Sequence, residues 1–343
     1  MIIRRLRVQN FRSHGDKTIV LSPNVTVITG ANGSGKTSLL EALYIGLQGK
    51  SFKGSDREVL STADNAEWYR IDLDDRIIKY ESTKPTRPKQ FVVENTSFAR
   101  LPAKHKYPVI LFEPDDLRLI NGSPERRRDF IDRFITTIDP LYSTNLSKYK
   151  RSLKQRNSLL KNKFSKASDF FAWDVAIAEY GAYIIERRVQ FIEELNKSIN
   201  QVYDDIAKSH DDTSVHYSRT LIGFSKQKLL NDLSANFERD KILGNTSVGP
   251  HRDDIVFEFN GSPATKLASR GENRSIILAL KFLEVQIVEQ LTGLKPIVLL
   301  DDVFSELDEV RQQALRELTS DHQVIMTSTH VLLTGDKFKQ IKL

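Results

Sequence analysis

The most constraining stretch of this chain is a β-branched run that breaks into a glycine-rich loop and then into an apolar helical segment. Residues 25–29 (Val-Thr-Val-Ile-Thr) predict a buried strand, and Gly30 to Thr37 fill the pattern G-x-x-x-x-G-K-T. Glycines let backbone N–H groups converge on an anion, and the N-terminus of the following helix adds partial positive charge. Because strand, loop and helix occur in the order that this motif requires, the stretch predicts a nucleoside triphosphate site.

Two side chains in this loop are expected to do more than bind through the backbone. Lys36 can reach the β- and γ-phosphates, and the Thr37 hydroxyl can ligate Mg²⁺. The residues expected to hold the nucleotide are Gly30, Ala31, Asn32, Gly33, Ser34, Gly35, Lys36, Thr37 and Ser38. Just upstream, Arg12 lies in a polar corner, where it either folds over a phosphate or base of the nucleotide or is a surface residue of a hairpin.

Length and composition narrow the class of protein. A chain of 343 residues is long for one hydrophobic core, so we expect two lobes. The absence of cysteine excludes disulfides, thiolate metal sites and cysteine catalysis, and it fits a cytoplasmic protein. No apolar stretch is long enough for a transmembrane helix, so we expect no membrane partner. The net charge of +6 permits a polyanionic partner without requiring one.

Short alternating segments in the first third of the chain predict an antiparallel sheet that flanks the nucleotide strand. They are residues 68–73, 76–81 and 91–93, whereas residues 2–8 and 18–21 are expected to be strands that precede the nucleotide strand at 25–29. A further buried strand is expected at 109–112, where four apolar residues run into Glu113-Pro114.

The pattern then becomes helical and polar, and we expect a helical lobe over residues 116–240. A first helix is expected to begin at Ser123-Pro124, and a long second one carries an apolar stripe. That stripe comprises Leu146, Tyr149, Leu153, Leu160 and Phe164. Residues 148–166 hold eight basic side chains and no acidic one, which is typical either of a solvated face or of a phosphate-facing surface. The second interpretation gives five candidate DNA contacts, Lys148, Lys150, Arg151, Lys154 and Arg156. No aromatic ladder suited to stacking bases is evident, so binding through the DNA backbone is expected.

Strand patterns resume at 248, and the last third of the chain supplies the remaining candidate site residues. Ser269 and Gly271 stand where a helix opens, which is a weak signal for a second anion site. Residues 297–300 predict a buried parallel strand whose end presents Asp301 for Mg²⁺ and Asp302 to orient or deprotonate water. His330 follows the strand expected at 323–327 and could sense the γ-phosphate.

These elements, in this order, resemble the ATP-binding-cassette ATPases of the SMC type, and within that class the RecF family of recombination mediators. The runs that narrow the resemblance to this family are Gly249 to Asp254, Leu153 to Asn157 and Ser305 to Asp308. The resemblance implies an α/β fold: a P-loop ATPase head, with a mixed sheet and flanking antiparallel strands, carrying an inserted helical lobe. We place the ATPase lobe at 1–115 and 241–343, and the helical lobe at 116–240.

The resemblance also implies a function. Members of this family bind ATP with Mg²⁺, dimerise on ATP, and bind single-stranded, gapped or double-stranded DNA. With RecO and RecR they place RecA at single-strand gaps, and they act in replication restart and the SOS response. Ser269 and Gly271 would close over the γ-phosphate held by a second copy, and His330 would be the switch histidine. Asp302 is a shorter base than glutamate, which predicts a weak, slow ATPase used as a dimerisation switch.

Two departures and two alternatives accompany this interpretation. In the signature loop, which starts at Ser269, Glu272 and Asn273 stand where a glutamine is expected after Gly271. The Q-loop glutamine of this class is also missing, since Gln90 is the only glutamine between the phosphate-loop helix and the helical lobe, and its role would fall to Glu113-Pro114-Asp115. The alternatives are a transporter-type nucleotide-binding subunit and the ATPase head of a nuclease complex. The basic helical lobe disfavours the first, and the second would need a metal cluster outside the nucleotide site.

Overall fold

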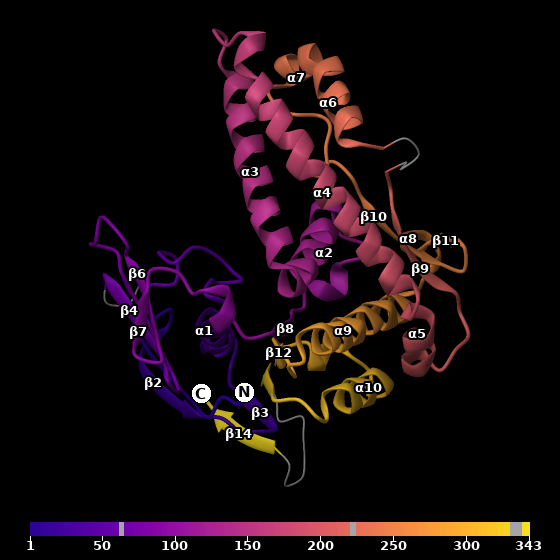
Figure 1. The fold of residues 1–343 in the computed structure, drawn as a ribbon. Helices are drawn as coiled ribbons and strands as arrows, with labels where there is room; N and C mark the ends of the chain where they lie inside the picture. Colours follow the sequence, from indigo (N-terminus) through magenta and orange to yellow (C-terminus); the bar gives the residue numbers. More distant parts are fainter. Residues whose placement is uncertain (62–64, 220–223, 330–337) are drawn as a thin grey trace. The chain divides into compact units, whose positions relative to one another are not determined.

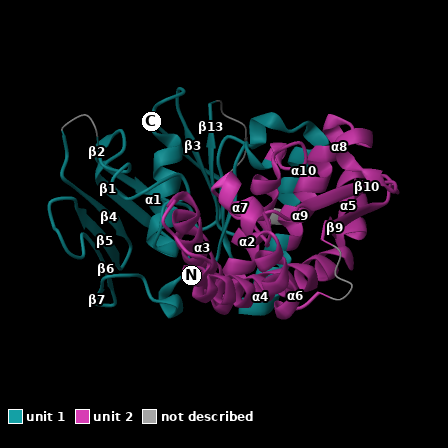
Figure 2. Ribbon diagram, turned by 90° about the horizontal axis from the view of Figure 1, so that it is seen from above, with its two compact units in different colours: residues 1–116, 284–343 teal, residues 117–283 magenta. Residues whose placement is uncertain are grey.

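A computed structural model describes residues 1–61, 65–219, 224–329 and 338–343 of the chain. The chain divides into two compact units, coloured separately in Figure 2. Unit 1 comprises Met1–Asp116 and Glu284–Leu343, and unit 2 comprises Leu117–Leu283. Within the described residues, no helix combines the length and apolarity needed to cross a membrane.

A five-stranded parallel sheet forms the centre of unit 1. Its order is β14-β3-β13-β12-β8. The strands are β3 (Val25–Thr29), β8 (Val109–Phe112), β12 (Ile297–Leu300), β13 (Val324–Ser328) and β14 (Phe338–Lys342). Strands β8, β12 and β13 are buried along their whole length, as expected of parallel strands covered on both faces. Because β13 pairs with both β3 and β12, the carboxyl ends of these three strands share one edge.

A six-stranded antiparallel sheet completes unit 1, in the order β2-β1-β4-β5-β6-β7. Its strands are β1 (Arg5–Phe11), β2 (His14–Val20), β4 (Trp68–Leu73), β5 (Arg76–Glu81), β6 (Lys89–Val93) and β7 (Thr96–Phe98). Helix α1 (Lys36–Gln48) packs against strands of both sheets and buries Leu39, Leu43 and Leu47 completely. The flanking antiparallel strands were predicted from the sequence, but they form a sheet separate from the parallel strands.

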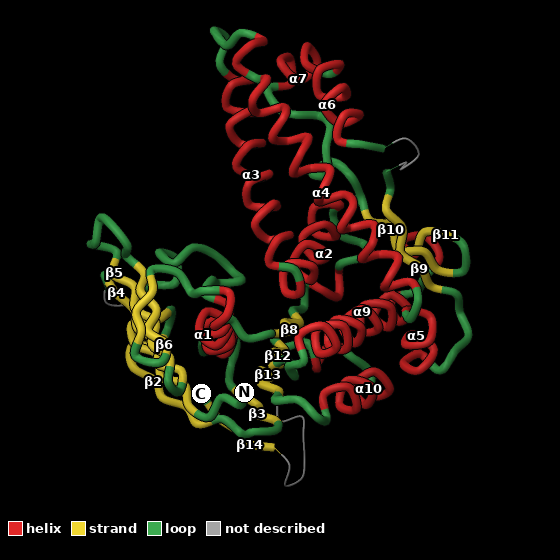
Figure 3. The backbone as a smooth tube through the Cα atoms, in the orientation of Figure 1, coloured by secondary structure: helices red, strands yellow, loops and turns green. Residues whose placement is uncertain are grey.

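Unit 2 is mainly helical (Figures 1 and 3). Its helices are α2 (Pro124–Ile138), α3 (Pro140–Lys161), α4 (Phe171–Asn196), α5 (Ile199–Ala207), α6 (Lys226–Ala235), α7 (Phe237–Leu243) and α8 (Ala264–Leu267). The Ser123 hydroxyl accepts the Arg126 N–H at the start of α2, and Pro124 occupies the first turn, as the sequence predicted. Helices α3 and α4 pack along each other as the two long helices of the unit.

The remaining helices complete the chain. Helix α9 (Arg270–Thr292) begins in unit 2 and ends in unit 1, and α10 (Glu309–Thr319) belongs to unit 1. Short 3₁₀ turns lie at Ala103–His105, Asp116–Arg118, Ala167–Asp169 and Phe304–Glu306.

The second unit boundary differs from the boundary expected at 240/241. Strand β10 (Ile255–Phe259) pairs with β11 (Ser262–Pro263) and with β9 (Thr213–Tyr217), so this three-stranded sheet belongs to the helical unit. The strand pattern that resumes near 248 therefore does not mark a return to the ATPase lobe. The change of unit comes at Leu283–Glu284, within α9.

Two further features of the fold were not predicted. Strand β14 pairs in parallel with β3 at the edge of the central sheet, beyond the strand that we expected to be last. Phe164 lies outside α3 and is 92% exposed, so its place in the apolar stripe was wrong. The helix ends at Lys161, and its 3.6-residue periodicity ends with it.

Candidate functional site

The glycine-rich loop joins β3 to α1 at the carboxyl edge of the parallel sheet. Gly33 and Gly35 both have positive φ (81° and 91°), a conformation that other residues adopt only at a cost. A Cβ atom on Gly35 would lie 2.4 Å from the Ser13 hydroxyl and 2.5 Å from the His14 ring, whose Nε2 is 3.1 Å from the Gly35 carbonyl oxygen. The corner between β1 and β2 therefore packs directly on the loop, and only glycine fits at position 35.

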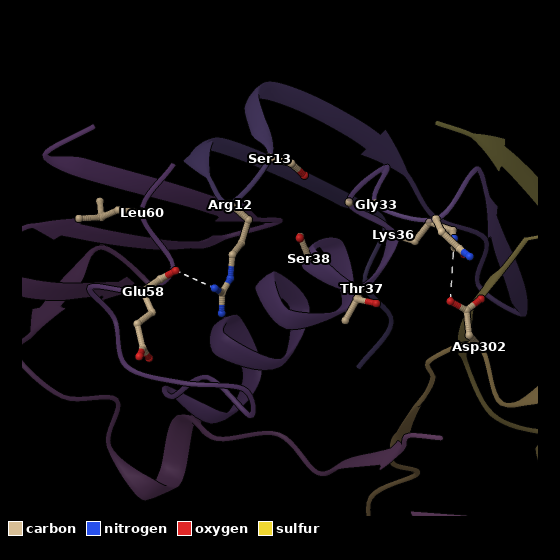
Figure 4. A pocket seen from close by; sticks show the side chains of 11 residues that line it. Arg12, Ser13, Gly33, Lys36, Thr37, Ser38, Glu58, Leu60 and Asp302 are labelled. Atoms are coloured by element: carbon tan, nitrogen blue, oxygen red, sulfur yellow. Dashed lines mark hydrogen bonds and ion pairs between the residues drawn. The ribbon is translucent and has the colours of Figure 1, made fainter. Parts of the chain in front are cut away.

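Lys36 is buried beneath this loop. Its ammonium group donates hydrogen bonds to the carbonyl oxygens of Gly30 (3.0 Å) and Ala31 (3.2 Å), and it lies 3.9 Å from an Asp302 carboxylate oxygen. Figure 4 shows the lysine pointing toward Asp302. The Ser34 hydroxyl in the same loop is buried with no hydrogen-bond partner among the described residues. This geometry suits an anionic oxygen ligand, because a cation and a free hydroxyl face the same loop.

Thr37 and Asp301 meet across the sheet edge. The Thr37 hydroxyl donates to Asp301 Oδ1 at 2.7 Å, and the Thr327 hydroxyl donates to the same oxygen at 2.9 Å. Lys53 lies 3.8 Å from the other carboxylate oxygen. A hydroxyl and a carboxylate are the hard oxygen ligands that Mg²⁺ takes, so the pair fits the predicted metal site. Thr327 was not predicted; it stands at the carboxyl end of the strand between β3 and β12.

Asp302 occupies a strained backbone position at this edge. Its φ is 51°, uncommon for a residue other than glycine, and its N–H donates to the Thr327 hydroxyl at 2.8 Å. One carboxylate oxygen, Oδ1, is buried with no hydrogen-bond partner in the described part of the chain. Burial raises the pKa of the Asp302 carboxyl above its ordinary value; Lys36 opposes the rise and Asp301 adds to it. A carboxyl with a raised pKa and a free oxygen is suited to accepting a proton.

Arg12 lines the same site and is held by two glutamates. Its Nε and Nη2 donate to the two carboxylate oxygens of Glu41 (2.9 and 2.8 Å), and its Nη1 donates to the Glu58 carbonyl oxygen at 2.7 Å. The hydrogen bonds to Glu41 raise the pKa of Arg12. Arg12 lines the same cavity as the glycine-rich loop, and its contact with a nucleotide stays a prediction. No sequence pattern pointed to Glu41, because its carboxylate is buried on a mostly apolar helix.

These groups surround one cavity of about 430 Å³ (Figure 4). Its lining contains most of the predicted loop together with Arg12 and Asp302. The lining residues are Arg12, Ser13, Asn32, Gly33, Gly35, Lys36, Thr37, Ser38, Glu58, Leu60 and Asp302. All of them belong to unit 1.

The predicted signature residues lie in unit 2, at the start of α9. The Glu272 carboxylate accepts the Ser269 N–H at 2.5 Å, and the Ser269 hydroxyl accepts the Glu272 N–H at 3.3 Å. This reciprocal pair is a capping box, which the spacing Ser-x-x-Glu could have revealed from the sequence. The carboxylate of Glu272 is therefore directed at its own helix terminus, which accounts for a glutamate at this unexpected position.

Glu113 follows β8 at the edge where Asp301 lies. The Asp301 N–H donates to the Phe112 carbonyl oxygen at 2.9 Å, and the Glu113 N–H donates to Asp116 at 3.0 Å. The assignment of the missing glutamine's role to Glu113-Pro114-Asp115 stays a prediction. His330 lies outside the described residues, so its assignment stays a prediction. Among the described residues, no cluster of three or more His, Asp or Glu side chains could hold a further metal ion.

The candidate DNA contacts separate into two groups. Lys148, Lys150, Arg151 and Lys154 are exposed on α3. Arg156 is completely buried, with Nε 2.6 Å from Asp174 and Nη1 2.7 Å from Asp240, so its assignment to DNA was wrong. Its counter-ions lie 18 and 84 residues away in the sequence, where local charge patterning could not reveal them.

Comparisons with known proteins find relatives over nearly the whole length of the chain. A family model described as an AAA domain matches residues 5–323. A protein of Streptococcus uberis is 36% identical over 365 residues (99% of this chain and 97% of the relative), and one of Lachnoclostridium phytofermentans is 34% identical over 339 residues (96% and 93%). Both are named DNA replication and repair protein RecF.

Two solved structures are also similar over nearly the whole chain. One is described as the recombination mediator protein RecF-ATPrS in the RecFOR pathway, with 30% identity, 99% and 95% coverage of the two chains and a TM-score of 0.85. The other, described as RecF-ATP, has 30% identity, 97% and 93% coverage and a TM-score of 0.83. This likeness confirms the predicted fold class, an α/β P-loop ATPase head with an inserted helical unit.

Proposed function

Because the chain belongs to the RecF family of DNA replication and repair proteins, we propose that it binds Mg²⁺-ATP at the Gly30–Thr37 loop and uses it to join two copies on DNA. The observation that carries the proposal is that Lys36, Thr37 and Asp302 line one cavity and that the Thr37 hydroxyl is hydrogen-bonded to Asp301. The two similar structures are described as RecF with ATP and with an ATP analogue, which supports the same ligand here.

The chain's own groups suggest how the nucleotide is held. The backbone N–H groups of the loop bind the phosphates, and Lys36 turns from the Gly30 and Ala31 carbonyl oxygens to the β- and γ-phosphates. Thr37 and Asp301 would hold Mg²⁺, and the ion would neutralise charge that develops on the phosphate oxygens. Arg12, anchored by Glu41, presents its guanidinium to the cavity beside Ser38.

ATP hydrolysis would be slow because the side chain proposed as its general base, Asp302, is one methylene shorter than a glutamate. Asp302 is fixed at the sheet edge by its own strained backbone and by the Thr327 hydroxyl, so it cannot move far toward the nucleotide. Its raised pKa favours proton acceptance, but the shorter side chain leaves it farther from an in-line water than a glutamate would be. Such a weak ATPase suits a dimer that stays on DNA until its ATP is slowly hydrolysed.

The other half of the nucleotide site would come from a second copy. Ser269 and Gly271 stand at the N-terminus of α9, where N–H groups and the helix dipole favour an anion. A γ-phosphate bound between one copy's loop and its partner's helix terminus would make the nucleotide part of the dimer interface.

DNA would lie on the helical unit, where Lys148, Lys150, Arg151 and Lys154 are exposed on one helix. We place this activity in the cytoplasm, in recombinational repair of single-strand gaps, replication restart and SOS induction, together with RecO and RecR and upstream of RecA loading. If about six phosphates are neutralised, log K should fall with log salt at a slope near −5. An affinity independent of salt would contradict this placement.

The test of ATP binding is a titration of the full chain with a fluorescent ATP analogue and Mg²⁺. Lys36→Ala should weaken binding tenfold or more, because it removes the cation that reaches the phosphates. Lys104→Ala is the matched control, since Lys104 is exposed in unit 1 and lies away from the cavity. Equal affinities for Lys36→Ala and Lys104→Ala would contradict the site.

A further inference from the structure

The end of unit 2 where α3 and α4 join exposes large apolar side chains. Phe164, in the loop after α3, is 92% exposed, and Phe171, the first residue of α4, is 69% exposed. Ile242 in the last turn of α7 is 86% exposed. Apolar side chains this exposed, gathered at one end of a domain, are typical of an interaction site.

Side-chain contacts bring these segments together. The rings of Phe170 and Phe237 meet edge to face at 5.0 Å, which places the start of α4 beside the start of α7. A Cβ on Gly244, just after α7, would lie 3.6 Å from the Lys161 side chain at the end of α3. Figure 1 likewise shows α7 beside the end of the α3–α4 pair. We call this region, residues 161–171 and 237–243, the tip.

The tip is also basic. Its exposed charges are five basic residues and two acidic ones: Lys161, Lys163, Lys166, Arg239 and Lys241 against Asp169 and Glu238. The buried acids nearby, Asp174 and Asp240, are already paired with Arg156. The tip thus offers positive charge and aromatic surface together.

A line of exposed lysines leads along α3 to the tip. Lys150, Lys154 and Lys161 are four and seven residues apart and so share one helix face, separate from the face that buries Tyr149 and Leu160. At ~1.5 Å per residue the line is about 16 Å long. It ends where Phe164 projects, flanked by Lys163 and Lys166.

We propose that the tip binds single-stranded DNA, with phosphates on the α3 lysines and an unstacked base on Phe164. The inference rests on the DNA binding proposed above and specifies its substrate and its place. A single strand presents the face of a base to an exposed ring, whereas in a duplex the base faces are stacked and only phosphates, sugars and base edges are accessible. The expectation that no aromatic ladder is present is untouched by this inference, which needs only the ring of Phe164, a residue that the sequence had placed in the apolar stripe of α3.

The positive charge of the tip favours DNA over a second copy of the chain or another protein as the molecule bound there. A second copy would bring the same positive tip against this one, and like charges oppose such a contact. A protein partner would need an acidic apolar segment, and lysines on both sides of the exposed Phe164 ring match a base and its phosphates more directly.

The experiment measures binding of the full chain to a 30-nucleotide oligothymidylate and to a 30-base-pair duplex, by fluorescence anisotropy. Phe164→Ala should weaken single-strand binding about fivefold or more and leave duplex binding within about twofold. Phe164→Trp should retain single-strand binding, because the larger ring stacks at least as well. Leu141→Ala is the matched control, since Leu141 is 58% exposed at the opposite end of α3. Photocrosslinking to 5-bromouracil-substituted oligonucleotide should label residues 161–171.

The outcomes distinguish a failure of the tip assignment from a failure of the proposed DNA binding. Wild-type single-strand affinity in Phe164→Ala, or equal weakening on both DNAs, would overturn the tip assignment while leaving DNA binding intact. Loss of ATP-dependent dimerisation with unchanged DNA binding would assign the tip to a second copy and also overturn it. A wild-type chain that binds neither DNA would refute the proposed function itself.

Discussion

Replacing the buried Arg156 with methionine should destabilise unit 2 strongly without acting through DNA contacts. The guanidinium holds Asp174 at 2.6 Å and Asp240 at 2.7 Å, and it also donates to the Thr246 hydroxyl at 2.9 Å. Methionine fills much of the same space but leaves two buried carboxylates without their counter-ion. Removing one partner of such a network costs about 3–5 kcal/mol. For a domain of 150–250 residues this lowers the melting temperature by about 6–20 °C.

The effect should depend on pH in a defined direction. Burial already raises the pKa of Asp174, and the hydrogen bond from Arg156 limits the rise. In Arg156→Met that limit is gone, so the pKa of Asp174 in the folded state rises further. Above this pKa the buried carboxylate is charged, and the loss of stability relative to the wild type has its full size. As the pH falls through this raised pKa the carboxyl group becomes neutral, so the loss of stability in Arg156→Met relative to the wild type should shrink as the pH is lowered.

The assay is thermal unfolding followed by circular dichroism, with Lys154→Met as the matched control on the same helix. Lys154 is exposed, so its substitution should change stability by no more than about 0.5 kcal/mol. Duplex affinity should fall in Lys154→Met and stay near wild type in folded Arg156→Met. If Arg156→Met were as stable as the control but lost DNA binding, Arg156 would be a surface contact and the buried network would be wrong.

Three further predictions concern the nucleotide site. Gly35→Ala should abolish ATP binding in the titration above, because its Cβ would meet Ser13 at 2.4 Å at a φ of 91°, whereas Gly15→Ala, with open space around it, should bind normally. Asp302→Asn should prolong the ATP-bound dimer, and wild-type hydrolysis should decline as the pH falls through the raised pKa of Asp302; an unchanged phosphate-release rate in the variant would remove Asp302 as the base. Glu272→Gln keeps the capping box but removes its charge, so dimerisation measured by light scattering should need less ATP, and a higher requirement would show that the carboxylate assists the interface.

Several strands and the glycine-rich loop were predictable because the sequence pattern of each lies within one short segment. β3, β4, β5, β8 and β10 begin and end where their apolar patterns do, and the loop from Gly30 to Thr37 carries its own strand and helix. Asp301 was predictable for the same reason, as the polar residue that ends a fully apolar strand.

The rest depended on residues that are far apart in the chain. Arg156 reads as one of eight basic residues until Asp174 and Asp240 fold against it. β10 reads as a strand of the ATPase lobe until it pairs with β9, some 40 residues earlier, and so joins the helical unit. Thr327 and Glu41 gain their roles only when β13 and α1 bring them to Asp301 and Arg12.

The central claim is that one nucleotide site needs two copies of the chain, and sedimentation velocity with Mg²⁺-ATP tests it most directly. Wild-type chains should form dimers only with the nucleotide, while Ser269→Arg should bind ATP normally and stay monomeric, and Lys36→Ala should stay monomeric for lack of ATP. A mixture of the two variants restores one complete site, from the intact loop of one copy and the intact Ser269 of the other, so it should dimerise. A Ser269→Arg protein that dimerises like wild type, or a mixture that stays monomeric, would contradict the account.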